Sequence, residues 1–371
     1  MRYKISDLLE LIMDFRGKTP KKLGLDWTEN KNDILAISAK NIKDGALINI
    51  NKSHYGDEQL YKKWMKFGDI HVGDILMTSE APLGETYLVT TPMRAIISQR
   101  VFLLRFKADL VDPWYMYSYM KSTDFKNKIT EKSSGTTVVG IKQKELLNID
   151  VDMPDMFCQQ RIGSIFKTIQ SKLDLNSKIN DNLLDVAQLI FNSMFPNVNY
   201  GTQTIGELTK NFDKFRKPLS KKQRIEIQGN YRYIGATSVN DYISKYNFDG
   251  IYLLLAEDGS VQDNNGFPIL QYVFGKFWPN NHTHVLQGNN ISTEWLYLFF
   301  RQHKVSELVT GAVQPKISQS NLNKISITAP TEEEKEIFST RTDNIFSLIR
   351  QNELQSTKLL MLKNLLLSKY F

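Results

Sequence analysis

The chain has 371 residues, 41% of them hydrophobic, and its 47 lysine and arginine residues exceed its 40 acidic residues to give a net charge of +7. This length can form two domains with separate cores, and the modest positive charge permits a nucleic-acid partner without requiring one. No apolar run reaches the roughly 18 residues of a membrane span, and the single Cys158 excludes an internal disulfide. Because Asp7, Glu10 and Asp14 interrupt the apolar residues at the start, we expect no signal peptide and a cytoplasmic location.

Residues 1–154 are predicted to form a first mixed α/β domain. Short β-branched and aromatic runs such as DILAIS, GDILMT and AIISQRVFLLRF predict strands, and PWYMYSYMKSTDFKNKI, with Trp114, predicts helical structure. Basic, amide and hydroxyl side chains in turn-rich places are candidates for nucleic-acid contacts, because lysine and arginine suit phosphates and amides can read base edges. These candidates are Arg16, Lys18, Lys21, Lys22, Lys40, Asn41, Lys43, Arg94, Arg100, Ser133, Ser134 and Thr136.

Residues 155–195 are predicted to form one long helix. Pro154 ends the preceding strand and Asp155 can cap the helix. Apolar residues then recur at a spacing of three or four, interrupted by Asn176 and Asn180, which is typical of a coiled-coil seam.

Residues 196–330 are predicted to form a second domain of the same mixed class, with strand-like runs such as YRYIGATSV and GIYLLLAEDG and a helix that places Trp295 where the first domain has Trp114. Its candidate contacts are Arg216, Lys217, Lys221, Lys222, Arg232, Thr237, Ser238, Asn240, His282, His284, Gln314 and Lys316. Taken one at a time, such residues are more often solvated surface; matched clusters in both domains strengthen the binding interpretation. No metal site is predicted, because His282 and His284 lack cysteine or carboxylate ligands at metal spacing.

Residues 331–371 are predicted to form a second long helix that begins with the capping box of Thr331 and Glu334. A seam of this length needs a partner helix, and antiparallel pairing of the two long helices would bring Asn176 opposite Asn352. A buried seam asparagine lowers stability but fixes register. The alternative is that both asparagines face solvent.

The chain contains an internal repeat. Residues 135–195 align without a gap on residues 311–371 at an offset of 176, and FRGKTPKK at 15–22 matches FRKPLSKK at 215–222 at an offset of 200. The first half therefore holds 24 more residues between its matched ends than the second. We interpret the chain as two copies of one module with similar flanks and divergent middles.

The search for catalytic motifs returns no convincing constellation. The sequence has no phosphate-cradling glycine loop, and DPWY at 112–115 fits the start of a helix, where aspartate caps and proline suits the first turn. We therefore expect a non-catalytic binding protein.

The duplicated glycine turn, with its I…L…I…P connector and long helix, resembles the specificity subunit of Type I restriction–modification systems, and the resemblance covers essentially the whole chain. It implies an α+β (mixed α/β) fold in which two pseudo-twofold-related target-recognition domains, 1–154 and 196–330, are separated by two long antiparallel coiled-coil helices, 155–195 and 331–371. The first helix is then the central spacer and the second the C-terminal spacer.

The same resemblance implies the partners. Each target-recognition domain would read one half of an asymmetric bipartite target in double-stranded DNA, with half-sites about one helical turn apart. Two modification (methyltransferase) subunits would dock on the chain and a restriction subunit would add translocation and cleavage. Adenosylmethionine, ATP and Mg²⁺ are then expected on those partners, with no cofactor in this chain.

Two other interpretations stay open from the sequence alone. The chain could be a stand-alone sequence-specific DNA binder, such as a repressor, that uses the same two domains. It could also be a scaffold whose domains bind other proteins rather than DNA.

Overall fold

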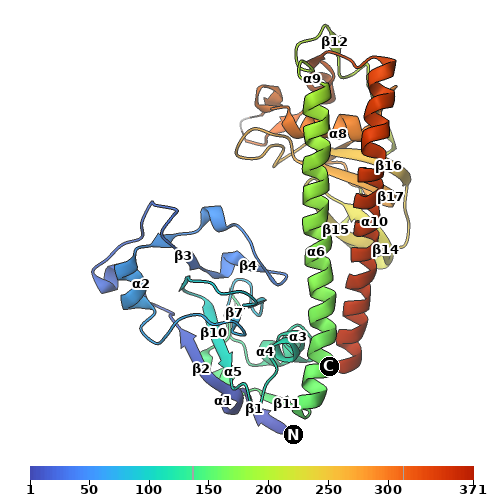
Figure 1. The fold of residues 1–371 in the computed structure, drawn as a ribbon. Coiled ribbons are helices and arrows are strands. Elements are labelled where there is room, and N and C mark those ends of the chain that lie inside the picture. The colour runs from blue at the N-terminus through green and yellow to red at the C-terminus, as the bar shows by residue number, and fades with distance from the viewer. Residues whose placement is uncertain (136–137, 312) are drawn as a thin grey trace. The chain divides into compact units, whose positions relative to one another are not determined.

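Two compact units make up the protein (Figure 1). The computed structural model describes residues 1–135, 138–311 and 313–371. Unit 1 consists of Met1–Asp174 together with Ser356–Phe371, and unit 2 consists of Leu175–Gln355. The two long helices, α6 (Met156–Met194) and α10 (Glu332–Tyr370), each contribute to both units. The predicted α+β class with two β-rich domains and two packed long helices is confirmed. The partition at residues 154, 195 and 330 stays a prediction.

Unit 1 is built on an antiparallel sheet that is buried on both faces. Its strand order is β2 (Leu9–Asp14), β10 (Val101–Phe106), β7 (Ile75–Thr78) and β8 (Thr86–Leu88). Side chains alternate along β10, so Phe102 and Leu104 enter a core beneath α3 (Pro113–Tyr119) and α4 (Thr123–Glu131), whereas Val101 and Leu103 enter a second core on the other face. This burial on both sides explains why the VFLLRF run is almost uniformly apolar.

The second core of unit 1 is closed by the segment between β2 and β7 together with β9, which lies between β8 and β10 in the chain. There the three-stranded sheet β6–β3–β9 forms, in which β3 pairs in parallel with β9. Trp64 is fully buried under this sheet and its indole nitrogen donates to the Ile97 carbonyl at 2.9 Å. The elements of this region are β3 (Ile34–Ile37), β4 (Ile42–Lys43), β5 (Ala46–Leu47), β6 (Tyr55–Gly56), α2 (Glu58–Trp64) and β9 (Ile96–Ile97), with 3₁₀ turns at Pro20–Leu23, Ala39–Asn41 and Ile50–Lys52.

Short elements complete unit 1 at its junction with α6. β1 (Arg2–Lys4) pairs with β11 (Asp150–Asp152), and α1 (Ile5–Leu8) and α5 (Gln143–Leu147) flank them. Gly163 of α6 lies against the start of α3, where an added Cβ would come within 2.3 Å of a carboxylate oxygen of Asp112. A side chain at this position would therefore force α6 away from the aspartate that caps α3 through the backbone N–H of Tyr115.

Unit 2 has a six-stranded sheet in the order β13, β18, β16, β17, β14 and β15. Leu253 and Leu255 of β16 enter a core shared with α8 and the long helices, while Leu254 enters a smaller core on the opposite face. The strands of unit 2 are β12 (Gln203–Thr204), β13 (Thr209–Asn211), β14 (Gln228–Ile234), β15 (Val239–Ile243), β16 (Phe248–Ala256), β17 (Leu270–Pro279), β18 (Thr283–Gly288), β19 (Val309–Thr310), β20 (Lys316–Ile317) and β21 (Ser326–Ile327). Its shorter helices are α7 (Lys221–Glu226), α8 (Thr293–Gln302) and α9 (Gln319–Asn323), with 3₁₀ turns at Asp213–Phe215 and Ser306–Leu308.

Both units share one sheet frame. The order β2–β10–β7–β8 in unit 1 matches β13–β18–β16–β17 in unit 2, and all these neighbours are antiparallel. The registers define equivalent residues, because Val101 pairs with Thr78 in unit 1 as Thr283 pairs with Ala256 in unit 2. Most of the extra length of the first half lies between β2 and β7. We call residues 15–74 of unit 1 and 212–247 of unit 2 the inserts.

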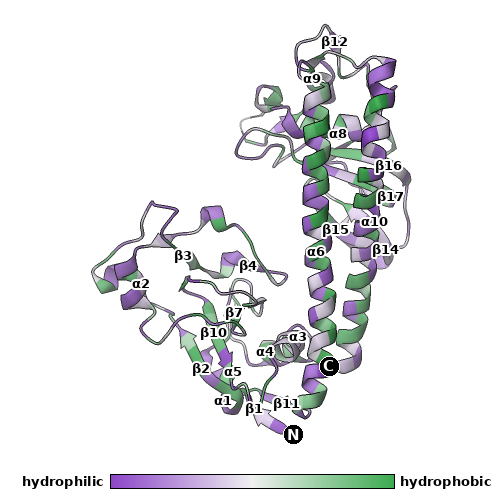
Figure 2. Cartoon of the chain, in the orientation of Figure 1, coloured by the Kyte–Doolittle hydropathy of each residue, from purple (hydrophilic) through white to green (hydrophobic). Residues whose placement is uncertain are grey.

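The two long helices run antiparallel within each unit. In unit 1 the Phe371 ring packs on Phe166, and Lys363 donates to Gln170. In unit 2 Asn176 donates to the carbonyl of Asn352 at 3.4 Å and to Gln355 at 2.9 Å. In Figure 2 apolar and polar residues alternate along both helices. No helix within the described residues is long and apolar enough to cross a membrane.

Asparagines connect the helices at this point through side-chain amides. Asn176 is 1% exposed, and Asn352 donates to the side-chain oxygen of Asn180 at 2.8 Å. Asn180 in turn donates to the carbonyl of Ile349. A buried amide is costly unless it is hydrogen-bonded. A shift of one helix along the other would therefore be unfavourable, because it would leave these amides without partners.

Replacing both Asn176 and Asn352 by leucine should raise the melting temperature and loosen the register, because an apolar pair tolerates sliding. Register is measured by cross-linking Gln170→Cys with Lys363→Cys, or with Leu359→Cys one turn away, in a Cys158→Ser background. The double leucine variant should cross-link at both positions, and the parent only at the first. Asn182→Leu, an exposed change on the same helix, is the control. A fall in stability with unchanged register would contradict the assignment.

Candidate nucleic-acid interface

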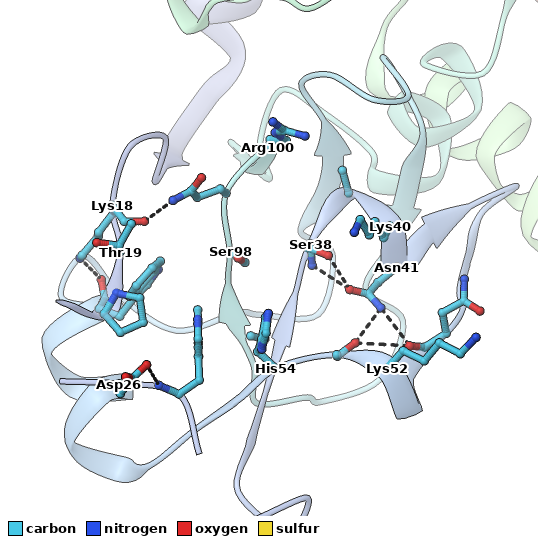
Figure 3. Close-up of a pocket in the computed structure, with 18 of the residues that line it drawn as sticks. Lys18, Thr19, Asp26, Ser38, Lys40, Asn41, Lys52, His54, Ser98 and Arg100 are labelled. Atoms are coloured by element: carbon cyan, nitrogen blue, oxygen red, sulfur yellow. Dashed lines mark hydrogen bonds between the residues drawn. The ribbon is translucent and has the colours of Figure 1, made fainter. Parts of the chain in front are cut away.

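An open pocket lies between the insert of unit 1 and its sheet (Figure 3). It encloses about 770 Å³. The shortlisted residues that it brings together are Lys18, Lys21, Lys40, Asn41 and Arg100. It also contains Lys52, so that cationic side chains line much of the pocket.

Aromatic rings form one wall of this pocket. The rings of Trp27 and His54 are stacked with centroids 5.3 Å apart and an interplanar angle of 12°, and Trp27 also contacts Trp64. Ser98 and Gln99 line the pocket as well. Sequence reasoning missed these residues because they come from separate segments. The bridge between Thr28 and Tyr55 brings Trp27 to His54, and the parallel pairing of β3 with β9 adds Ser98 and Gln99.

The cationic side chains of the pocket differ in whether they already have partners within the protein. Lys18 donates to the carbonyl of Trp64 at 2.8 Å and lies over the Phe15 ring; burial, helped by the charge of Lys66, lowers the pKa of Lys18. Arg100 is exposed, pairs with Glu80 at 2.7 Å, and has a backbone φ of 70°, which is uncommon for a residue with a side chain. Lys21, Lys40 and Lys52 are exposed, and their ammonium groups have no hydrogen-bond or ion-pair partner among the described residues.

Asn41 has a structural role in this pocket. It is 3% exposed, and its side-chain oxygen accepts hydrogen bonds from the backbone and hydroxyl of Ser38 while its amide donates to Ser53 (Figure 3). The side chain therefore shapes the turn rather than facing a ligand.

The other shortlisted residues of unit 1 lie outside the pocket. Lys22 donates to the carbonyl of Gly17, and Arg94 pairs with Glu58 at the surface. Lys43 is exposed beyond the turn that contains Lys40, and Ser133 donates to the carbonyl of Thr130. Ser134 forms a bridge with Gly140, and Thr136 lies outside the described residues.

In unit 2 the shortlisted residues divide into an exposed and a buried group. The exposed group is Lys217, Lys221, Lys222, Thr237, Ser238, Asn240, His282, Gln314 and Lys316. Within it, His282 pairs with Asp258, and Lys316 with Glu257 and Asp258. Arg232 is mostly covered, donates to the carbonyl of Phe274, and has its pKa lowered by burial.

A buried network of charges surrounds His284, which is 1% exposed. Its Nδ1 lies 2.6 Å from Asp213, and its Nε2 lies 2.9 Å from the carbonyl of Ile317, which can only accept. Arg216 donates to Glu257 at 2.6 Å and to the carbonyl of Thr283 at 2.7 Å. His284 and Arg216 thus hold the sheet together from within, and their side chains are not available to a ligand.

Protonation of both ring nitrogens follows from this geometry. Burial alone would lower the pKa of His284, but the hydrogen bond and charge of Asp213, the carbonyl of Ile317 and the charge of Glu257 outweigh it and raise that pKa. For Asp213, burial is likewise opposed by the hydrogen bond and charge of His284, and its pKa is lowered. The pair is therefore held as imidazolium and carboxylate.

Asp213, Glu257 and His284 bring their ligand atoms within 4.8 Å of one another, which is close enough to hold a metal ion. However, the carboxylate oxygens of Glu257 already face Arg216 and Lys316, and both nitrogens of His284 are hydrogen-bonded. We interpret the cluster as a structural ion network.

The network has a topological counterpart in unit 1 that also fixes the connector. In unit 1 the backbone N–H of Ile141 donates to Ser79 and its carbonyl accepts from Arg16 at 3.0 Å. In unit 2 the N–H of Ile317 donates to Glu257 and its carbonyl faces His284.

Different chemistry serves the same purpose in the two copies. By strand register Phe102 occupies the place of His284, and the Arg16 guanidinium lies 5.1 Å from the centre of the Phe102 ring. Arg16 also pairs with Asp14, at the end of β2. Unit 1 therefore uses a cation–π contact and one ion pair where unit 2 uses a network.

A basic pocket with an aromatic wall, in a protein that repeats its β-rich domain, is typical of proteins that bind nucleic acids. The sequence matches the family of Type I restriction modification DNA specificity domains over residues 1–185 and 197–363, and the chain belongs to that family. The resemblance inferred from the connectors and helices is thereby confirmed.

Individual relatives are similar over shorter stretches. A Haemophilus influenzae protein described as a type I restriction enzyme specificity subunit is 32% identical over 127 residues, which cover 34% of this chain and 32% of the relative. The EcoDI specificity subunit of Escherichia coli is 28% identical over 163 residues, which cover 43% of this chain and 33% of the relative. The matched part thus spans about a third of the length of each of these relatives.

A solved structure shares the fold. The S subunit of a Type I restriction–modification system from M. genitalium superposes with a TM-score of 0.54 at 13% identity, covering 100% of this chain and 96% of that one.

The charge network predicts a pH dependence of stability. Because the pKa of His284 is raised in the folded state, its contribution is fully present below the unfolded pKa of about 6.5 and is lost as the pH rises through the raised value. As the pH rises above about 6.5, the free energy of opening of β18 should therefore fall, by about 1.4 kcal/mol in total for each unit by which the pKa is raised.

Hydrogen exchange of the β18 amides measures this, with β10, which has Phe102 at the equivalent place, as the internal reference. His284→Gln should remove the pH dependence from β18 and leave β10 unchanged. Equal pH dependence in the two strands would show that His284 is not the responsible group.

Proposed function

We propose that this chain is the address-reading subunit of a Type I restriction–modification enzyme. In this proposal each unit recognises one half of an asymmetric, bipartite target in double-stranded DNA. The repeated helices set the gap and receive the modification subunits.

The sheet frame that occurs twice, with a different insert at the same point, carries the proposal. A frame of four equivalent strands gives each unit the same scaffold, and the insert enters between equivalent strands in both. If the inserts make the base contacts, unequal inserts imply unequal half-sites. The asymmetric target follows from this single observation.

Charge supports DNA as the ligand of the inserts. Lys21, Lys40 and Lys52 are exposed cations around the pocket of unit 1, and Lys217, Lys221 and Lys222 are exposed on the insert of unit 2. Such side chains neutralise phosphates without regard to sequence, while amides and hydroxyls nearby can read bases.

A repeated apolar feature supports two copies of one partner. Val186 and Leu189 of α6 are 47% and 69% exposed in unit 2, and Leu362 and Leu365 of α10, which occupy the equivalent repeat positions, are 43% and 65% exposed in unit 1. Exposed apolar side chains at matching positions fit two matching docking surfaces. We assign each surface to one modification subunit.

The chemistry then belongs to the partners. Adenosylmethionine would be bound by the modification subunits, and ATP and Mg²⁺ by a restriction subunit. This chain would contribute recognition and geometry. It would act in the cytoplasm, where the partners and chromosomal DNA are found.

The test is a map of methylated adenine across the genome of the source strain, with and without this gene. Deletion should abolish methylation at one gapped, asymmetric motif, because the modification subunits would no longer be directed to that sequence. Replacing residues 217–247, the part of the insert beyond the largely buried Asp213 and Arg216, by the corresponding residues of another family member should then change one half of the motif and leave the other half intact.

Re-introduction of the unaltered gene is the control and should restore the original motif. Persistence of every methylated motif after deletion would count against the proposal. A change in both halves after the exchange of one insert would contradict the assignment of one half-site to each unit.

The docking surfaces give a prediction of stoichiometry. Leu189→Glu or Leu365→Glu should each reduce the complex from two modification subunits per chain to one, because a carboxylate would be buried without a partner. The double variant should bind none. Native mass spectrometry of co-expressed subunits reads the ratio directly.

Ser177→Glu, an exposed change on α6 more than three turns before Leu189, is the matched control and should leave two subunits bound. Two bound subunits in the double variant would exclude these surfaces as the docking sites.

A further inference from the structure

One turn of the fold is built twice, at equivalent places in the two inserts. In unit 1 Ile37 pairs in parallel with Ile97, and its carbonyl accepts from the N–H of Ser98 at 2.8 Å. In unit 2 Ile234 pairs in parallel with Pro279, and its carbonyl accepts from the N–H of Asn280 at 2.9 Å. The residues that follow these two isoleucines therefore occupy the same position relative to the shared frame.

We call residues 38–43 and 235–240 the reading turns. Their sequences are SAKNIK and GATSVN, so that Lys40 and Thr237 are the third residue after their isoleucine, and Lys43 and Asn240 the sixth. In unit 1 the N–H of Asn41, the fourth residue, donates to the carbonyl of Ser38 at 2.9 Å, whereas in unit 2 the N–H of Gly235, the first residue, donates to the carbonyl of Ser238 at 2.8 Å. The two turns thus leave the shared frame at the same point and carry different side chains on differently closed backbones.

Each turn has a rigid base. In unit 1 the buried Asn41 holds Ser38 and Ser53. In unit 2 the amide of Gln271 donates to the carbonyls of Gly235 and Ala236 at 2.9 and 3.1 Å. A fixed base is what a base-reading side chain needs, because discrimination depends on holding donors and acceptors in position.

The side chains at the tips are exposed. Among the described residues, those of Lys40, Lys43, Thr237 and Asn240 have no hydrogen-bond or ion-pair partner, and the amide of Asn240 lies against Gly235 of its own turn. Lys40 also lines the basic pocket. Their polar atoms are therefore available to a ligand.

We propose that the reading turns are the specificity elements of the two units, with the pairs Lys40/Thr237 and Lys43/Asn240 as the discriminating positions. The inference rests on the proposed function, which supplies the DNA. In the major groove lysine suits the O6 and N7 acceptors of guanine, asparagine pairs with N6 and N7 of adenine, and the threonine methyl contacts that of thymine. The turn of unit 1 therefore reads guanine, and the turn of unit 2 reads an A·T pair.

Phosphate binding explains these positions less well. A position that only neutralises phosphate should be cationic in both copies, whereas Lys40 and Lys43 are replaced by the uncharged Thr237 and Asn240. The cations left for phosphates are those beside the turns, such as Lys52 in the pocket of unit 1.

The experiment maps methylated adenine in the source strain with chromosomal variants of the full-length chain. Asn240→Ala should relax one base position in one half of the motif, and Lys43→Ala one position in the other half, each with about a tenfold to hundredfold loss of discrimination. The reciprocal exchange of Lys43→Asn with Asn240→Lys should shift the preferred base from guanine to adenine in one half and from adenine to guanine in the other.

Matched controls separate base reading from other effects. Ser244→Ala, an exposed change just beyond β15, should leave the motif unchanged, and Lys52→Ala should lower methylation at all sites without relaxing any base. Melting temperatures of the purified variants should equal that of the parent, because all the altered side chains are exposed.

The outcomes distinguish this inference from the function beneath it. If gene deletion removes the motif but the turn variants leave every base of it unchanged, or lower methylation uniformly, the reading turns are not the specificity elements and the proposed function stands. If gene deletion leaves the motif in place, the proposed function fails.

Discussion

Burial of the central strands on both faces is the constraint on which the rest of this structure depends. β10 in unit 1 and β16 in unit 2 send alternate side chains into two separate cores. The far core must be covered, and in each unit the insert covers it, with Trp64 in unit 1 and Phe212 in unit 2. The interior of an insert is therefore fixed by packing. The exposed residues of its turns do not pack in this core. Substitutions there therefore change the surface without destabilising the fold.

Much of this architecture could be predicted from the sequence, because the signals involved are local or periodic. The two long helices were visible from their seam and their caps, and the repeat from its gapless alignment. The alignment of the shorter helices between the two units was harder to predict. Trp295 was matched with Trp114, whereas the N–H groups bonded to the capping residues show that it corresponds to Tyr115, one residue later. Inside a short helix an offset of one residue changes which side chain enters the core.

The candidate site was predictable only as a set of residue types. A sequence shows that Asn41, His284 and Arg216 are polar, but their partners come from segments distant in the chain, and these decide whether the side chain faces inward. His284 meets Asp213 across 71 residues and Ile317 across 33. The exposed tips of the reading turns were in the predicted set for the same reason that the buried residues were: both lie in turn-rich, polar stretches. The exposed tips can be told from the buried residues only in the folded structure, where strands from distant segments pair.

The composition of unit 1 has a consequence for biosynthesis. The half-buried Phe371 packs against the core of this unit, where its ring contacts Tyr115, Tyr119 and Phe166, yet all of unit 2 lies between these residues and Phe371 in the chain. A ribosome therefore delivers every residue of unit 2 before it delivers the last segment of unit 1. Until residues 356–371 emerge from the ribosome, the apolar surface of unit 1 that packs against them is exposed. It stays exposed while unit 2 is synthesised. Completion of the first-made domain is thus coupled to synthesis of the second.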